Sequence, residues 1–186
     1  SGVGAIYGGY SENGSANGNT VISTGDLVLG GSNALTGGYS EHGEANNNIV
    51  TVSGSIDRGT VAGGWAAHQV GNAAKAAENK VTLTGTGFIS NVWGGWARYG
   101  TAVSNTIDLS YTGKIDCVYG GEGGESASGN TVTLRPNNTH GGDLVIRDAI
   151  YGGFAKQAHG NRVEIMKGTN VKVEYVYGGQ VGNAVR

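Results

Sequence analysis

The sequence has few of the residues that mark disulfide-bonded, strongly charged or membrane-embedded proteins. Its 186 residues include one cysteine and one proline, and only 14% are charged, with a net charge of −2. One cysteine rules out a disulfide framework, and one proline argues against a Pro/Gly-rich disordered linker. The weak net charge gives no electrostatic reason to expect a nucleic-acid partner. No apolar run approaches the ~18–20 residues of a transmembrane helix, so we expect no direct membrane insertion of this segment.

Glycine is what the chain has in excess: 37 residues, about a fifth of the total. A set of seven Gly-Gly pairs returns at spacings of 29, 26, 31, 26, 32 and 26 residues. The pairs begin at Gly8, Gly37, Gly63, Gly94, Gly120, Gly152 and Gly178. A period of 20–50 residues is the signature of a solenoid or another repeat array.

A short strand pattern follows each of the first six pairs. It opens on an asparagine and alternates apolar residues, as in Asn48-Ile-Val-Thr-Val and Asn79-Lys-Val-Thr-Leu. This period of two predicts a strand with one buried face. A glycine-containing turn and a second short strand lead into the next Gly-Gly pair. No sustained 3.6-residue apolar period is present, so we predict an all-β protein.

One repeat buries too few aliphatic side chains to fold alone, so the units must stack. We predict a parallel β-solenoid (β-helix) of about six to seven repeats of 26–32 residues, with a right-handed coil. Asparagine suits a left-handed corner, and its amide can bond to the asparagine of the next coil. Gly-Gly would form a sharper corner, where a positive φ or close backbone approach excludes Cβ. The predicted structural corners are Asn48, Asn79, Asn105, Asn130, Asn161, Gly63, Gly94 and Gly120.

The whole chain, residues 1–186, is predicted to be a single repeat domain. Repeats begin near residues 6, 35, 61, 92, 118, 150 and 176. Terminal repeats of a solenoid are normally atypical caps, and neither end of this sequence resembles one. We therefore expect the chain to be an excised part of a longer array.

The unit Tyr-Gly-Gly-Tyr-Ser-Glu-x-Gly-x-Ala-x-x-Asn-x-Val occupies residues 7–21 and returns in large part over residues 37–50. It resembles repeats in the passenger regions of bacterial autotransporter and adhesin-like surface proteins, and the resemblance covers almost the whole chain. It implies a β-solenoid passenger that is exported through the outer membrane and acts as an adhesin or a stalk. The corresponding localisation is extracellular, at the bacterial cell surface. Trp65-Ala-Ala-His and Phe154-Ala-Lys-Gln depart from the Tyr-Ser-Glu part of the motif.

Aromatic residues flank the Gly-Gly pairs in two rows. The row after the pairs supplies the predicted binding residues Tyr10, Tyr39, Trp65 and Trp96. Exposed rings in a row could stack on sugars. The alternative is that they pack over the glycines and on one another, gaining ~0.5–1.5 kcal/mol per pair.

No catalytic or metal-binding motif is evident, so we expect no enzymatic activity and no cofactor. Asp108 and Glu164 share one repeat position, but they lie two repeats apart with Thr133 between them. The histidines lack the spacing of a metal site. Glu122 and Glu125 stand in a glycine-rich stretch that we predict to be a solvated loop, and Cys117 occupies a position without special chemistry.

The sequence thus favours a structural or adhesive segment of an exported bacterial surface protein. The alternative is a glycan-binding or polysaccharide-degrading β-helix. The expected partner is a host-cell glycan or protein receptor, and the ends or faces of the solenoid offer a route to self-association.

Overall fold

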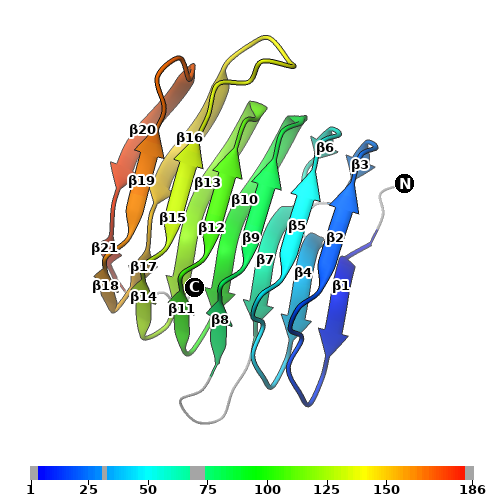
Figure 1. The fold of residues 1–186 in the computed structure, drawn as a ribbon, viewed down its shortest axis with the longest axis vertical. Helices are drawn as coiled ribbons and strands as arrows, with labels where there is room; N and C mark the ends of the chain where they lie inside the picture. Colours follow the sequence, from blue (N-terminus) through cyan, green and yellow to red (C-terminus); the bar gives the residue numbers. More distant parts are fainter. Residues whose placement is uncertain (1–3, 31–32, 68–73, 183–186) are drawn as a thin grey trace.

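The chain is an all-β protein whose strands stack in successive coils. The computed structural model describes residues 4–30, 33–67 and 74–182. This part of the chain contains no helix, and hence none long and apolar enough to cross a membrane. Parallel strands stack over about six turns, which confirms the predicted parallel β-solenoid (Figure 1). Residues 1–3, 31–32, 68–73 and 183–186 of the predicted domain lie outside the described part.

A large sheet forms one side of the solenoid. Its strands follow the chain in order: β1 (Ile6–Ser11), β4 (Ala34–Ser40), β7 (Thr60–Ala66), β10 (Thr86–Ala97), β13 (Thr112–Gly123), β16 (Leu144–Tyr151) and β20 (Val171–Tyr177). Four two-residue strands extend it: β3 (Leu27–Val28), β6 (Ile56–Asp57), β17 (Phe154–Ala155) and β21 (Gln180–Val181). Equivalent repeat positions pair directly, for example Val92 with Val118.

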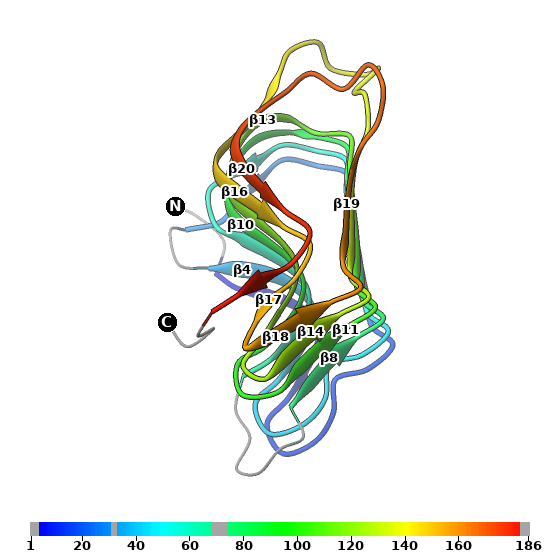
Figure 2. The ribbon, with the colours of Figure 1, turned by 90° about the vertical axis from the view of Figure 1, so that its left-hand side faces the viewer.

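The Asn-x-Val-x-Leu segments form the opposite side, a six-stranded sheet. Its strands are β2 (Thr20–Ser23), β5 (Ile49–Val52), β9 (Lys80–Leu83), β12 (Thr106–Leu109), β15 (Thr131–Leu134) and β19 (Arg162–Ile165). A small third sheet closes the coil between the other two (Figure 2). It contains β8 (Lys75–Ala77), β11 (Thr101–Val103), β14 (Ser126–Ser128) and β18 (Gln157–His159). The sequence pattern predicts only two strands per repeat, and this third strand was not predicted.

The interior is a continuous aliphatic core between the two large sides. Val50, Val81, Ile107 and Val132 are fully buried from the six-stranded sheet, and they face residues such as Val92 of the large sheet. Burial fades toward the ends, where Ile6 and Val173 are only partly buried against the core. Each coil therefore relies on its neighbours for burial, as a solenoid requires.

The predicted asparagine ladder is confirmed. The backbone N–H and the Nδ2 of Asn79 both donate to Oδ1 of Asn105, at 3.0 and 2.9 Å. Asn105 makes the same two bonds to Asn130, and Asn48 makes them to Asn79. All four side chains are essentially inaccessible to solvent. The ladder satisfies polar groups that would otherwise be costly to bury.

The left-handed conformation, however, lies one residue before each asparagine rather than on it. Among the described residues, φ is 57° at Asn47, 56° at Glu78 and 55° at Ser104. Glycine takes the same place at Gly18, Gly129 and Gly160. The asparagine itself continues into the strand, because its amide must stay aligned with the ladder. The prediction of a left-handed asparagine was therefore wrong by one position.

The Gly-Gly pairs do not form a turn with positive φ. Gly63, Gly94 and Gly120 lie inside strands β7, β10 and β13, and none has a φ in the left-handed region. The second reason given for glycine, close approach, is confirmed. A Cβ on Gly63 would lie 2.8 Å from Cβ of Asn79, and one on Gly64 would lie 2.5 Å from Nδ2 of Asn79. The pair thus lets the large sheet pass directly over the asparagine ladder.

Candidate functional site

At the Gly-Gly pairs the large sheet bends inward, and this bend determines the shape of its outer surface. Between β16 and β17 the sheet bends toward the six-stranded sheet (Figure 2). The residues on either side of each glycine pair then face outward along the bend. The aromatic residues at these places form what we call the aromatic stripe. Its members are Tyr7, Tyr10, Tyr39, Trp65, Trp93, Trp96, Tyr119, Tyr151, Phe154 and Tyr177.

The structure brings the four predicted binding residues together in one row of the stripe. Tyr10, Tyr39, Trp65 and Trp96 occupy paired register positions on β1, β4, β7 and β10. Successive ring centroids are 5.6, 5.7 and 4.5 Å apart. The rings pack on one another, as one of the two sequence interpretations expected. They also keep part of their surface open, from half-buried Trp65 to Tyr10, which is 54% exposed.

The other row consists of the residues just before the glycine pairs. It lacks rings in two of the first coils and carries a ring in every later one. Thr36 and Ala62 are buried and carry no ring, and Tyr7 packs instead on Tyr39, at 5.1 Å. From Trp93 onward every coil carries a ring. Tyr119, Tyr151 and Tyr177 stack with centroids 5.0 and 5.3 Å apart and planes within 11°. The stripe is therefore continuous because rings from one row cover the gaps in the other.

The row after the glycine pairs has its own interruption, at Glu122. This residue pairs in register with Trp96 on one side and with Phe154 on the other. It is only 9% exposed, and its Oε2 accepts a hydrogen bond of 2.8 Å from Nε1 of Trp93. The surrounding glycines predicted a solvated loop at Glu122, and that prediction was wrong, because Glu122 lies in β13 and is nearly buried. The repeat position, which is aromatic in the four preceding coils, is the signal that could have found it.

A hollow of about 290 Å³ opens in the stripe at this interruption. It is lined by Trp65, Asn91, Trp93, Trp96, Cys117, Tyr119 and Glu122. Two other hollows among the described residues are smaller, at about 90 and 180 Å³, and lie away from the stripe. Ligand pockets typically measure ~300–1,000 Å³ and combine aromatic walls with a few polar groups. The hollow is at the small end of that range and has that composition.

Glu122 is the only aspartate, glutamate, lysine, arginine or histidine among the residues that line the hollow. Burial and then the adjacent Asp148 carboxylate raise the pKa of the Cys117 thiol, which donates to Oδ2 of Asp148 at 3.2 Å. Burial also raises the pKa of the Tyr119 hydroxyl well above its ordinary value. Both groups consequently stay protonated at neutral pH. In addition, the Trp65 indole nitrogen is buried with no hydrogen-bond partner in the described part of the chain.

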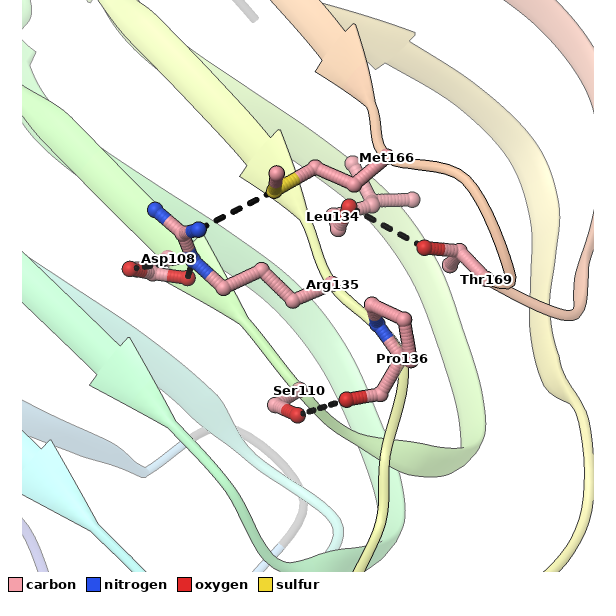
Figure 3. Close-up of polar contacts among 7 residues, drawn as sticks. All are labelled: Asp108, Ser110, Leu134, Arg135, Pro136, Met166 and Thr169. Atoms are coloured by element: carbon pink, nitrogen blue, oxygen red, sulfur yellow. Dashed lines mark hydrogen bonds and ion pairs between the residues drawn. The ribbon is translucent and has the colours of Figure 1, made fainter.

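The acidic residues considered for hydrolysis lie on the opposite, six-stranded sheet. Asp108, Thr133 and Glu164 do occupy successive register positions, as predicted. Arg135 Nε contacts both oxygens of Asp108, at 2.7 and 2.9 Å, and its Nη1 lies 3.0 Å from Sδ of Met166 (Figure 3). Glu164 is bridged by Arg162 at 3.1 Å. Each carboxylate is thus engaged by its own arginine instead of facing the other across a substrate site.

Further polar contacts hold this region together from coil to coil. Ser110 Oγ donates to the Pro136 carbonyl at 2.6 Å, and Thr169 Oγ1 donates to the Leu134 carbonyl at 3.2 Å (Figure 3). Glu125, the second carboxylate of the glycine-rich stretch, is ion-paired with Lys156 at 2.7 Å. Among the described residues no group of three or more His, Cys, Asp or Glu side chains could hold a metal ion.

Comparisons with protein-family models, curated proteins and solved structures found no match.

Proposed function

We propose that this chain is a structural and adhesive segment of an exported bacterial surface protein, with the aromatic stripe as its binding surface. The observation that carries the proposal is the stripe itself. It is a run of partly exposed rings that follows the stacked strands from β1 to β20. Clustered exposed apolar surface on an otherwise polar protein typically marks an interaction site. Repeat proteins use such extended surfaces for binding.

The interior supports the structural half of the proposal. The asparagine ladder and the aliphatic core link each coil to the next by the same contacts. A stack built this way gains length without changing its cross-section, as suits a stalk. The ion pairs at Asp108 and Glu164 do not favour the polysaccharide-degrading alternative, because both oxygens of Asp108 are already engaged.

Adhesion of coated beads tests the proposal. Beads carrying the chain are counted on cultured epithelial cells and on surfaces coated with mixed glycans. The stripe variant is Tyr39→Ser/Trp65→Ser/Trp96→Ser. The matched control is Thr51→Ala/Thr82→Ala, which changes paired, half-buried positions on the six-stranded sheet. Circular dichroism confirms that both variants keep their β-structure.

We expect the stripe variant to lose most of its adhesion and the control to retain it. Equal adhesion of the two variants, or no adhesion by the unmodified chain, would overturn the proposal.

A further inference from the structure

Exposed hydrophobic side chains are concentrated at the two ends of the solenoid. Strands β1, β2 and β3 form the first end, and β19, β20 and β21 form the second (Figure 1). Of the eleven large hydrophobic side chains that are exposed in the described part of the chain, nine lie on these strands or directly after them. They are Tyr7, Tyr10, Ile22 and Val28 at the first end, and Ile165, Met166, Tyr175, Val176 and Val181 at the second. Clustered exposed apolar surface typically marks an interaction site.

The hydrophobic core itself is open at both ends. Ile6 and Val176 belong to one row of register partners, which passes through Val118. Val118 is fully buried, whereas Ile6 is only partly buried and Val176 is 45% exposed. Two further core rows also end in partly buried residues, Val21 and Val163 in one and Leu27 and Val171 in the other. A further coil placed against either end would therefore bury apolar surface, which is the main favourable term in association.

The asparagine ladder ends in hydrogen-bonding groups that complement each other. Within the described part of the chain no donor reaches Oδ1 of Asn19, although Oδ1 of each later asparagine accepts two bonds. At the other end, Nδ2 of Asn161 donates to the Ala127 carbonyl at 2.9 Å. The backbone N–H of Asn161, which in earlier coils donates to the next asparagine, has no acceptor in the described part. The first end thus offers an acceptor and the second end offers donors.

Net charge also differs between the two ends. Residues 1–66 contain five acidic residues and one arginine, a net charge of −4. Residues 135–186 contain seven lysines or arginines and four acidic residues, a net charge of +3. Opposite charges attract across an interface and like charges repel, so this distribution favours contact between unlike ends.

We propose that copies of this chain associate end to end, with β1, β2 and β3 of one copy extending the sheets that finish at β19, β20 and β21 of another. Unpaired edge strands are ready templates for such pairing. In continued register, Ile6 of one copy lies opposite Val176 of the other, and Oδ1 of Asn19 accepts from Asn161. The contact joins two different surfaces and leaves one free end on each copy, so further copies can add and form a fibre. This inference does not depend on ligand binding by the aromatic stripe.

Sedimentation velocity of the chain, from low to high micromolar concentration, tests the proposal. We expect species larger than the monomer, in a share that grows with concentration. Val176→Lys blocks the second end and Ile6→Lys blocks the first, because each places a charge in a row that the contact would bury. Each variant alone should weaken association by about tenfold or more. An equimolar mixture of the two should form dimers and nothing longer, since each variant keeps one intact end.

The matched control is Ile49→Lys, which introduces the same charge at a comparably exposed position. Ile49 is 41% exposed on the outer face of the six-stranded sheet, which an end-to-end contact leaves open. Val181→Lys repeats the block at the second end on a side chain that is already 66% exposed and contributes little to the fold of the monomer. Circular dichroism at low concentration checks that every variant keeps its β-structure.

An unmodified chain that stays monomeric at every concentration would overturn the inference. So would a mixture of Val176→Lys and Ile6→Lys that stays monomeric. Dimers formed by Val176→Lys alone would indicate contact between like ends and would refute the head-to-tail arrangement. Loss of association in Ile49→Lys would implicate a face of the solenoid instead of its ends. The stripe variant used in the bead assay should associate like the unmodified chain, so the two proposals can fail separately.

Discussion

Two ladders run along this solenoid, one inside and one outside, and they differ in how strictly they repeat. The inner ladder has asparagine in all six described coils, from Asn19 to Asn161, joined by the same side-chain bond between each pair. The outer aromatic stripe changes residue from coil to coil and is interrupted at Thr36, Ala62 and Glu122. The inner ladder is held constant by its burial, whereas the outer one is free to vary.

The physical reason is the cost of an unsatisfied buried polar group. Each inner asparagine from Asn48 to Asn161 accepts two bonds from the preceding coil. Replacing one therefore leaves two buried donors without an acceptor and out of reach of water. A ring on the outside can be exchanged for another ring, or omitted, with a smaller loss. Residues that depart from the repeat therefore point to function mainly in the outer aromatic stripe. Among them, Glu122 has the most distinctive chemistry.

The largest effect should come from breaking the inner ladder at its centre. Asn105→Ala leaves the backbone N–H and Nδ2 of Asn79 without their shared acceptor. Both donors are buried, so we expect a loss of about 3–5 kcal/mol in the free energy of unfolding. Urea unfolding monitored by circular dichroism measures it.

The matched control for this prediction is Asn19→Ala in the first coil. Asn19 is only partly buried and donates to Asn48 from one end of the described ladder. Its replacement should cost about 1 kcal/mol. Equal losses at the two positions would show that the ladder is not what stabilises the centre.

The next effect should come from closing the space over the ladder. Gly95→Ala would bring a Cβ within 2.6 Å of Nδ2 of Asn105. Overpacking of this kind costs roughly 1–3 kcal/mol. Gly25→Ala is the control, because a Cβ there meets nothing within 4 Å. The double variant Gly95→Ala/Asn105→Ala should lose less than the sum of its parts, since the two residues compete for one space. Additive losses would contradict the close-approach explanation for glycine.

The sequence was sufficient to predict the strands that carry an alternating pattern. Asn48-Ile-Val-Thr-Val predicted β5, and the shared positions of Asp108 and Glu164 predicted their register. The third sheet was missed because strands such as β11 have three residues and are rich in small side chains, too short to show a period of two. Its pairing comes from neighbouring coils rather than from local preference.

The errors about glycine and Glu122 share one cause. Glycine serves both positive φ and close approach, and sequence alone does not distinguish them. The Gly-Gly pairs therefore suggested positive φ as well as close approach, and only close approach is found. The glycines around Glu122 suggested a loop. Inside a stack, the position within the repeat determines the environment, and that position placed Glu122 among the aromatic residues.

A single ring removed from the outer stripe should cost less than a change to the inner ladder. Tyr39 contacts Tyr7, Tyr10 and Trp65 at centroid distances of 5.1–5.7 Å and is half-buried. We expect Tyr39→Ala to lose about 1–2 kcal/mol, and Tyr39→Phe to lose little, because the ring contacts remain. Thermal unfolding compares the two. If Tyr39→Ala lost as much stability as Asn105→Ala, the outer stripe would matter as much for stability as the inner ladder, contrary to this prediction.

The smallest expected effect is electrostatic and lies at the exposed start of the stripe. The Tyr10 hydroxyl donates to Oε1 of Glu41 at 2.8 Å, and this bond is the main reason that its pKa is raised from 10.0 to about 12. A raised pKa means that the folded state favours the protonated hydroxyl. The stabilisation is therefore fully present below pH 10 and is lost as the pH rises toward about 12. Ultraviolet absorbance of tyrosinate, as the difference between the unmodified chain and Tyr10→Phe, follows this group alone. In a Glu41→Gln background the same difference should titrate nearer to 10.0, because the charged acceptor is gone. An unchanged midpoint would show that Glu41 does not control Tyr10.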